Sequence, residues 1–137
     1  MENRIQHAVD LRNLHGCNCA QAVLCAYADL FGLSETDACK IAEGFGTGMG
    51  GMRDTCGAVT AAFMLIGLKN SSGVQGDKST RAATYKQVRD LAEAFKEKAG
   101  SIICRELKGE TGLPVYPCPK CIETAALLFE KCLESSK

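Results

Sequence analysis

Apolar residues recur every three or four positions along almost the whole chain, and no segment alternates apolar and polar residues as a half-buried strand does. This period is typical of amphipathic helices. It predicts helices over residues 3–14, 19–31, 34–43, 55–68, 79–99 and 102–108, with a last one from 119 onward. We therefore expect an all-α fold, a single-domain bundle of about six helices that comprises residues 1–137.

Short polar residues mark where these helices begin. Each of four residues precedes a predicted helix and can cap it: Asn18, Ser34, Asp54 and Ser101. The helix over 55–68 has almost no polar side chains, which predicts burial on every side and a place at the centre of the fold. The apolar face of the 79–99 helix comprises Tyr85, Val88, Ala92, Phe95 and Ala99.

Nine cysteines in 137 residues are many for a chain long enough to build a core without disulfides. In a reducing compartment such a density indicates metal ligation or redox chemistry, and the odd number leaves at least one thiol free. Cys25, Cys39 and Cys132 fall inside predicted helices, where core packing accounts for them. The H-x-C-x-C pattern at residues 15–19 is a conceivable metal cluster, although its histidine also suits the C-terminal end of the first helix.

Five cysteines share a place in the first turn of a predicted helix: Cys19, Cys56, Cys104, Cys118 and Cys121. Unpaired backbone N–H groups and the positive end of the helix dipole stabilise an anion there, which lowers the pKa of a thiol. A thiolate is both the better nucleophile and the form that binds metals. We predict that these thiols meet in one pocket.

A glycine-rich stretch, "GFGTGMGGMRDTCGAV", runs directly into Cys56. Its glycines allow positive φ and close backbone approach, so that amides can form a concavity for an anion, with Arg53 beside it. The cofactor-binding or anion-binding residues predicted here are Gly46, Gly48, Gly50, Gly51 and Arg53. The match to G-x-G-x-x-G follows a helical segment and lacks a βαβ pattern, so a dinucleotide site is rejected.

The same residues carry a resemblance to a known family. The stretches are "NCAQAVLCAYADLFGL", "EGFGTGMGGMRDTCGAVTAAFMLIGLK", "FKEKAGSIICRELKG" and "CPKCIETAALLFE", in this order. They resemble the C-GCAxxG-C-C family of small redox-active proteins, some of which carry selenocysteine. The resemblance puts the family's cysteines on Cys19, Cys56, Cys104 and Cys118, with Cys121 as a competitor for the last place; Ala61 stands where the motif ends in glycine. It implies thiol or metal redox work in an organism with anaerobic metabolism.

Three functions of different classes follow. The first is thiol redox chemistry, in which Cys56 attacks a disulfide or oxidised sulfur and a second helix-start thiol resolves the product. The second is an iron–sulfur cluster or other soft-metal site with Cys19, Cys56, Cys104 and Cys118 as ligands. The third is a helical adaptor in which the cysteines are incidental. A possible thiol-based oxidoreductase is the enzyme class implied by the first.

Charge and hydropathy limit the classes of binding partner to expect. Sixteen Lys and Arg residues match sixteen Asp and Glu residues, so no long-range field attracts nucleic acid or anionic lipid. The longest apolar run, residues 58–68, is about half of the ~20 residues that a membrane span requires, and the chain starts without a secretory signal. We expect a cytoplasmic protein that meets a small sulfur-containing substrate or a redox partner protein; a homodimer is left open.

Overall fold

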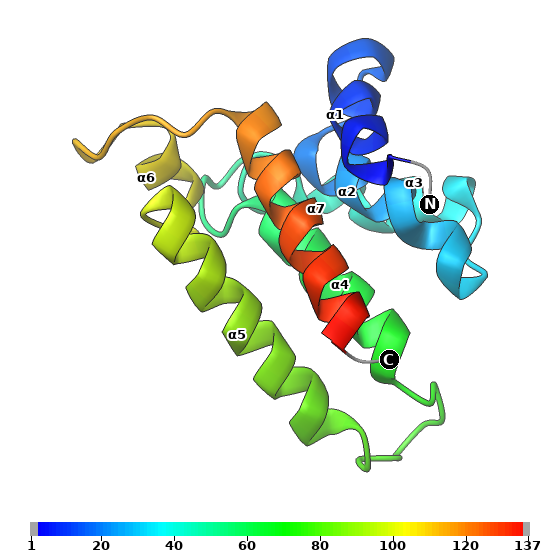
Figure 1. Ribbon diagram of the computed structural model, residues 1–137. Coiled ribbons are helices and arrows are strands. Elements are labelled where there is room, and N and C mark those ends of the chain that lie inside the picture. The colour runs from blue at the N-terminus through cyan, green and yellow to red at the C-terminus, as the bar shows by residue number, and fades with distance from the viewer. Residues whose placement is uncertain (1–2, 136–137) are drawn as a thin grey trace.

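The computed structural model describes residues 3–135 and folds them into a helical bundle (Figure 1). Within that part of the chain there are seven α-helices and no strand, which confirms the all-α expectation. They are α1 (Arg4–His15), α2 (Cys19–Tyr27), α3 (Glu35–Ala42), α4 (Gly57–Asn70), α5 (Arg81–Ala99), α6 (Cys104–Leu107) and α7 (Cys118–Ser135). Since α6 is only one turn, six longer helices build the bundle.

Two of the predicted caps are found where the sequence puts them. The Asn18 side chain accepts from the Gln21 amide at 2.9 Å, and the Gln21 side chain accepts from the Asn18 amide at 3.0 Å, so that the two residues cap the start of α2 reciprocally. The Ser34 hydroxyl accepts from the Asp37 amide at the start of α3. Gly16 ends α1 in the left-handed conformation, with φ 74°.

The other two predicted caps are wrong. Cys56 itself is the N-cap residue of α4, because Thr55 before it is held in an extended bridge to Ile103, so the helix begins two residues later than expected. Asp54 has a different role, as its carbonyl accepts from the Cys104 amide. Ile103 is the N-cap residue of α6, while the Ser101 hydroxyl accepts from the Ile103 amide and donates to the Glu106 carboxylate.

The core lies between two layers of helices. In Figure 1, α4, α5 and α7 run side by side, and α1, α2 and α3 gather across one end of them. The helix α4 contacts α2, α5 and α7, as its central place predicts. Burial on every side is found in α2, whose nine residues are all buried, whereas α4 leaves Leu68 exposed.

Aromatic residues fill the centre of this core. Tyr27 and Phe129 meet edge to face with 5.2 Å between ring centroids, and both side chains are fully buried. Phe95 on α5 is buried as predicted, but Tyr85 on the same helix is 55% exposed. The face of α5 that packs inward is therefore centred on Leu91 and Phe95, and its first turns extend beyond the core.

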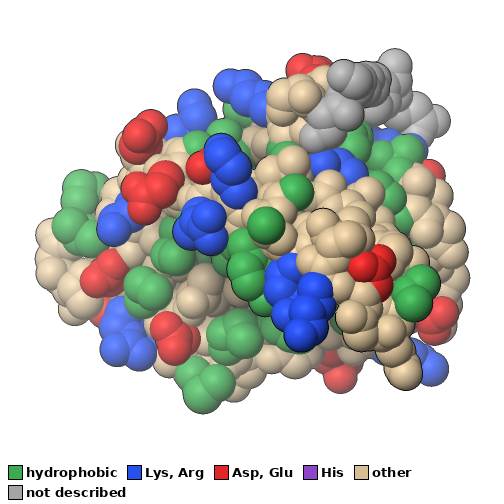
Figure 2. All heavy atoms as spheres, turned by 90° about the horizontal axis from the view of Figure 1, so that it is seen from below, with side chains coloured by type: hydrophobic (Ala, Val, Ile, Leu, Met, Phe, Trp, Pro, Cys, Tyr) green, Lys and Arg blue, Asp and Glu red, His purple; other side chains and the backbone are tan. Residues whose placement is uncertain are grey.

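The surface mixes charges of both signs. Figure 2 shows Lys, Arg, Asp and Glu side chains interspersed with apolar ones on one face of the molecule. This matches the balanced composition. Each helix of the described part is too short or too polar to cross a bilayer.

Candidate functional site

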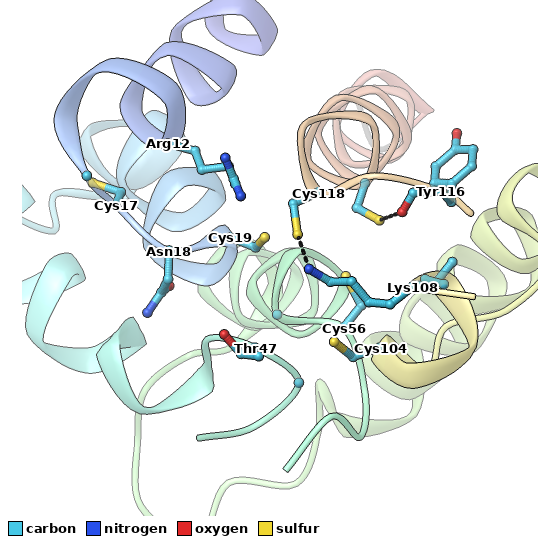
Figure 3. Close-up of a pocket in the computed structure, with 15 residues that line it drawn as sticks. Arg12, Cys17, Asn18, Cys19, Thr47, Cys56, Cys104, Lys108, Tyr116 and Cys118 are labelled. Carbon is cyan, nitrogen blue, oxygen red and sulfur yellow. Dashed lines mark hydrogen bonds between the residues drawn. The ribbon is translucent and has the colours of Figure 1, made fainter. Parts of the chain in front are cut away.

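The site is a cavity of about 330 Å³ at the end of the bundle where α7 begins. Its walls come from α1 and α2, the glycine-rich loop, the start of α4, α6 and the start of α7 (Figure 3). Six of the nine cysteines line it: Cys17, Cys19, Cys56, Cys104, Cys118 and Cys121. The structure thus brings together all five of the helix-start cysteines, and their chemical roles remain predictions.

A short backbone bridge places Cys56 next to Cys104. Thr55 and Ile103 pair in antiparallel fashion. On either side of this pair the Cys56 amide donates to the Ile102 carbonyl at 2.7 Å, and the Cys104 amide donates to the Asp54 carbonyl at 2.6 Å. These bonds connect two segments that are about fifty residues apart in the sequence, which is why both thiols face the same cavity.

The glycines of the loop allow close packing. A Cβ on Gly48, which has φ 65°, would lie 2.6 Å from the Cβ of Cys104 and 2.7 Å from the Arg53 Cα. At Gly57 a Cβ would lie 2.7 Å from the Phe45 carbonyl oxygen, so the start of α4 can approach the loop only without a side chain. Gly46 likewise lies directly against the Asn18 side chain.

The loop amides are mostly engaged within the loop. The amides of Met49, Gly51, Arg53 and Asp54 each donate to a carbonyl of residues 45–48. Of the residues predicted to cradle an anion, Gly48 lines the cavity, whereas Gly46, Gly50, Gly51 and Arg53 are not among its lining residues. Arg53 instead forms an exposed ion pair with Glu110. The loop positions Cys56 and Cys104 rather than presenting free N–H groups.

Three neighbouring groups stabilise a thiolate at Cys118. A hydrogen bond from the Cys19 thiol, the Lys108 ammonium 3.0 Å from its sulfur, and the nearby Arg12 guanidinium lower the pKa of Cys118 to about 4. Donating that hydrogen bond, together with burial, raises the pKa of Cys19 above its ordinary value. The two side chains therefore act as one pair, a half-buried thiolate on α7 and a buried thiol on α2.

A second pair lies deeper. A hydrogen bond from the Cys121 thiol and the backbone amides of Val59 and Ala58 lower the pKa of Cys56. The neighbouring Cys56 and burial raise the pKa of Cys121, whose thiol donates to the Tyr116 carbonyl oxygen at 3.5 Å. Cys56 is only 6% exposed, so this pair is shielded from solvent.

The prediction that every helix-start position makes its thiol more acidic is wrong for three of the five. Cys19 and Cys121 are the donors of their pairs, and burial raises the pKa of Cys104. The helix that begins at Cys104 has only four residues, too few for a sizeable dipole. A position at a helix start therefore lowers the pKa only of Cys56 and Cys118, each of which also has a neighbouring thiol donor.

Sequence reasoning missed two cations at this site. Arg12 reaches from α1 toward the sulfurs of Cys19 and Cys118, and Lys108 lies at the end of α6 beside Cys118 (Figure 3). In the sequence, Arg12 is one charged residue of an amphipathic helix and Lys108 precedes a polar loop. No local signal distinguishes them from solvated lysines and arginines, since both act through contacts to α7.

The remaining cysteines lie elsewhere. Another cavity, of about 390 Å³, is lined by Cys25 and Cys39 together with Cys17, which thus lines both cavities. Burial, followed by the proximity of Cys39, raises the pKa of both Cys17 and Cys25, the latter to about 12. Cys39 accepts from the Gln21 side chain at 3.2 Å and is only half-buried, as is Cys132. Core packing, predicted for Cys25, Cys39 and Cys132, thus describes Cys25 best.

The same sulfurs include the predicted ligands of a metal site. Thiolates are suitable ligands for iron–sulfur clusters and other soft metals. However, nowhere between residues 3 and 135 do three or more His, Cys, Asp or Glu side chains converge in a way that could hold a metal ion. The sulfurs are instead arranged as hydrogen-bonded pairs, Cys19 with Cys118 and Cys56 with Cys121. As placed, they do not form a ligand shell.

Comparison with known proteins gives one result. The sequence model of the family described as "Putative redox-active protein (C_GCAxxG_C_C)" matches residues 17–132, which include all five helix-start cysteines. No curated protein and no solved structure matches the chain. Since the match extends over most of its length, the chain belongs to the C_GCAxxG_C_C family of redox-active proteins.

Proposed function

We propose that the protein carries out thiol–disulfide exchange in the cavity, with Cys118 as the sulfur that reacts with the substrate and Cys19 as its partner. The observation that carries the proposal is the half-buried Cys118 sulfur with the Lys108 Nζ at 3.0 Å and the Cys19 thiol donating to it, contacts that lower the pKa of Cys118. The sequence favoured Cys56 as the attacking residue. Cys56, however, is buried, and the substrate sulfur must come within bonding distance of the attacking sulfur. Cys118 is therefore the better candidate.

The exchange balances with two cysteines. The Cys118 thiolate attacks one sulfur of a disulfide R–S–S–R′, so that a Cys118–S–R bond forms, the S–S bond breaks and R′–S⁻ leaves. Cys19 then loses its proton and attacks the Cys118 sulfur, forming a Cys19–Cys118 disulfide and releasing R–S⁻, which takes up the proton. The substrate gains two electrons and the protein loses two. The surroundings of Cys118 stabilise its thiolate and so favour the reduced protein. The reaction therefore also runs in reverse, with the protein disulfide oxidising a dithiol.

The Cys56–Cys121 pair supports the proposal as a second dithiol in the same cavity. It gives the site four electrons in all, two in each pair. A cytoplasmic location is part of the proposal, since a reducing compartment maintains such thiols in the reduced form.

The test is to trap the mixed disulfide. A Cys19→Ser variant, treated under anaerobic conditions with 2-hydroxyethyl disulfide, should accumulate a stable adduct on Cys118, whereas the unaltered protein should proceed to a Cys19–Cys118 disulfide. A Cys132→Ser variant serves as the control, because Cys132 lies outside the cavity. Peptide mass spectrometry distinguishes these products. An adduct that forms first on another cysteine, or none at Cys118, would refute the assignment.

The iron–sulfur alternative is distinguished by the same preparation. Anaerobically purified protein is brown if it carries a cluster and colourless if it does not, and iron and sulfide analysis quantifies the result. Stoichiometric iron and sulfide would refute thiol–disulfide exchange in favour of an iron–sulfur cluster, since a cluster occupies the thiolates that exchange requires.

A further inference from the structure

The charge of the cavity differs from that of the rest of the molecule. Over the chain as a whole, acidic and basic residues are equal in number, and in Figure 2 they lie interspersed. The lining of the cavity includes Arg12 and Lys108 but no Asp or Glu. Within this lining, the cysteine thiolates are therefore the side-chain anions that these two cations meet.

The two cations are not equally engaged. Lys108 donates to the Cys118 sulfur at 3.0 Å. Arg12 pairs with no carboxylate within residues 3–135, and its one side-chain hydrogen bond is to the neighbouring Asn13 at 3.3 Å. Its guanidinium lies beside the sulfurs of Cys19 and Cys118 at the cavity wall (Figure 3). A planar guanidinium binds carboxylates through two parallel hydrogen bonds, and within residues 3–135 Arg12 has no carboxylate partner.

We propose that the substrate of this site is a small disulfide that carries a carboxylate, with Arg12 binding the carboxylate while Cys118 exchanges with the sulfur. The inference rests on the proposed function. A cavity of about 330 Å³ is at the lower end of small-molecule sites and suits a compound of this size.

The charge balance explains why the cations matter during the reaction. An anionic disulfide is repelled by a free thiolate, and Arg12 offsets this repulsion as the substrate enters. When the Cys118–S bond forms and the substrate S–S bond breaks, the charge moves from Cys118 to the leaving thiolate. Lys108 then loses its anionic partner, so that both cations face the bound carboxylate and stabilise the mixed disulfide.

Three linear disulfides of similar length separate charge from size: 3,3′-dithiodipropionate is anionic, 2-hydroxyethyl disulfide is neutral and cystamine is cationic. The rate at which Cys118 is lost as a free thiol is measured for each at pH 7 by mass spectrometry of the tryptic peptide 109–120, which contains no other cysteine. We expect the anionic disulfide to react about tenfold faster than the cationic one, and the difference to shrink as salt screens the charges.

The variant Arg12→Gln should lower the ratio of the anionic rate to the neutral rate about tenfold, while Arg89→Gln, on the exposed face of α5, should leave this ratio as it is. The ratio corrects for any change in the acidity of Cys118. Equal rates for all three disulfides, or a ratio that Arg12→Gln does not change, would overturn the substrate assignment. Failure of the neutral disulfide to react at Cys118 would instead overturn the proposed function. The salt dependence is measured on the unaltered protein and needs no variant to fold.

Discussion

Replacing Lys108 by methionine removes the ammonium group from beside Cys118 while retaining the length of the side chain. For unit charges separated by 3.0 Å, Coulomb's law gives about 1.4 kcal/mol in water and about 5.5 kcal/mol at an effective dielectric constant of 20. These limits correspond to about 1 and about 4 pKa units. Because Lys108 is exposed, solvent screening favours the lower half of this range, about 2 units. The pKa of Cys118 should therefore rise from about 4 to roughly 6.

The assay is alkylation by iodoacetamide as a function of pH, followed on the peptide that contains Cys118. The unaltered thiol is about 90% ionised at pH 5, so its rate should be nearly the same at pH 5 and pH 8. In Lys108→Met the thiolate fraction at pH 5 falls to about 10%, and the rate should rise about tenfold between pH 5 and pH 8. The variant should also react faster than the unaltered protein at pH 8, since a more basic thiolate is the stronger nucleophile.

Lys131→Met is the matched control. Lys131 is an exposed lysine on the same helix as Cys118, at its opposite end, so the variant loses one charge without a change at the cavity. Its rate profile should coincide with that of the unaltered protein. A pH profile that Lys108→Met leaves unchanged, or one that Lys131→Met shifts equally, would refute the reasoning that a local ion pair makes Cys118 acidic.

Three further predictions concern stability, each measured by urea unfolding under reducing conditions. Gly48→Ala should destabilise the fold by about 1–3 kcal/mol, because it combines a positive φ with a Cβ 2.6 Å from that of Cys104; Gly44→Ala, with open space around it, should cost less than about 1 kcal/mol. Phe95→Ala should cost about 3–5 kcal/mol by leaving a cavity among α4, α5 and α7, and a value below 1 kcal/mol would place this ring outside the core. The pKa of Cys118 is lower in the folded state than in the unfolded chain, so its stabilising effect is complete above the unfolded value of 9.0 and is lost as pH falls through about 4. The unfolding free energy of the unaltered protein minus that of Cys118→Ser should accordingly be greater at pH 7 than at pH 4, and the opposite trend would contradict the ionised state of this sulfur.

Local sequence patterns predicted much of the fold because their causes are local. The caps at Asn18 and Ser34 depend on contacts three residues away, and the apolar period of each helix is visible in its own residues. The start of α4 was predicted wrongly because the bridge between Thr55 and Ile103 is a long-range contact that overrides the capping tendency of Asp54.

In the candidate site, too, the features with local causes were predictable and those set by long-range contacts were not. Helix-start positions identified five of the six cysteines that line the cavity, since these positions follow from helix boundaries. Which of these thiols is ionised depends on pairs formed across the bundle, between α2 and α7 and between α4 and α7. The pairing of Cys118 with Cys19 and Lys108 joins residues up to about a hundred positions apart, and no local pattern encodes it.

The assembly of the cavity from distant segments also affects how its chemistry can be used to follow folding. Cysteine trapping ordinarily labels molecules that have opened, because a buried thiol becomes accessible on unfolding. Here the labelling preference is inverted at acidic pH, since the groups that ionise Cys118 disperse when the helices separate and its pKa returns toward 9.0. At pH 5 an alkylating reagent therefore modifies Cys118 in folded molecules and leaves it unmodified in unfolded ones. The extent of alkylation at Cys118 thus reports the fraction of molecules that are folded.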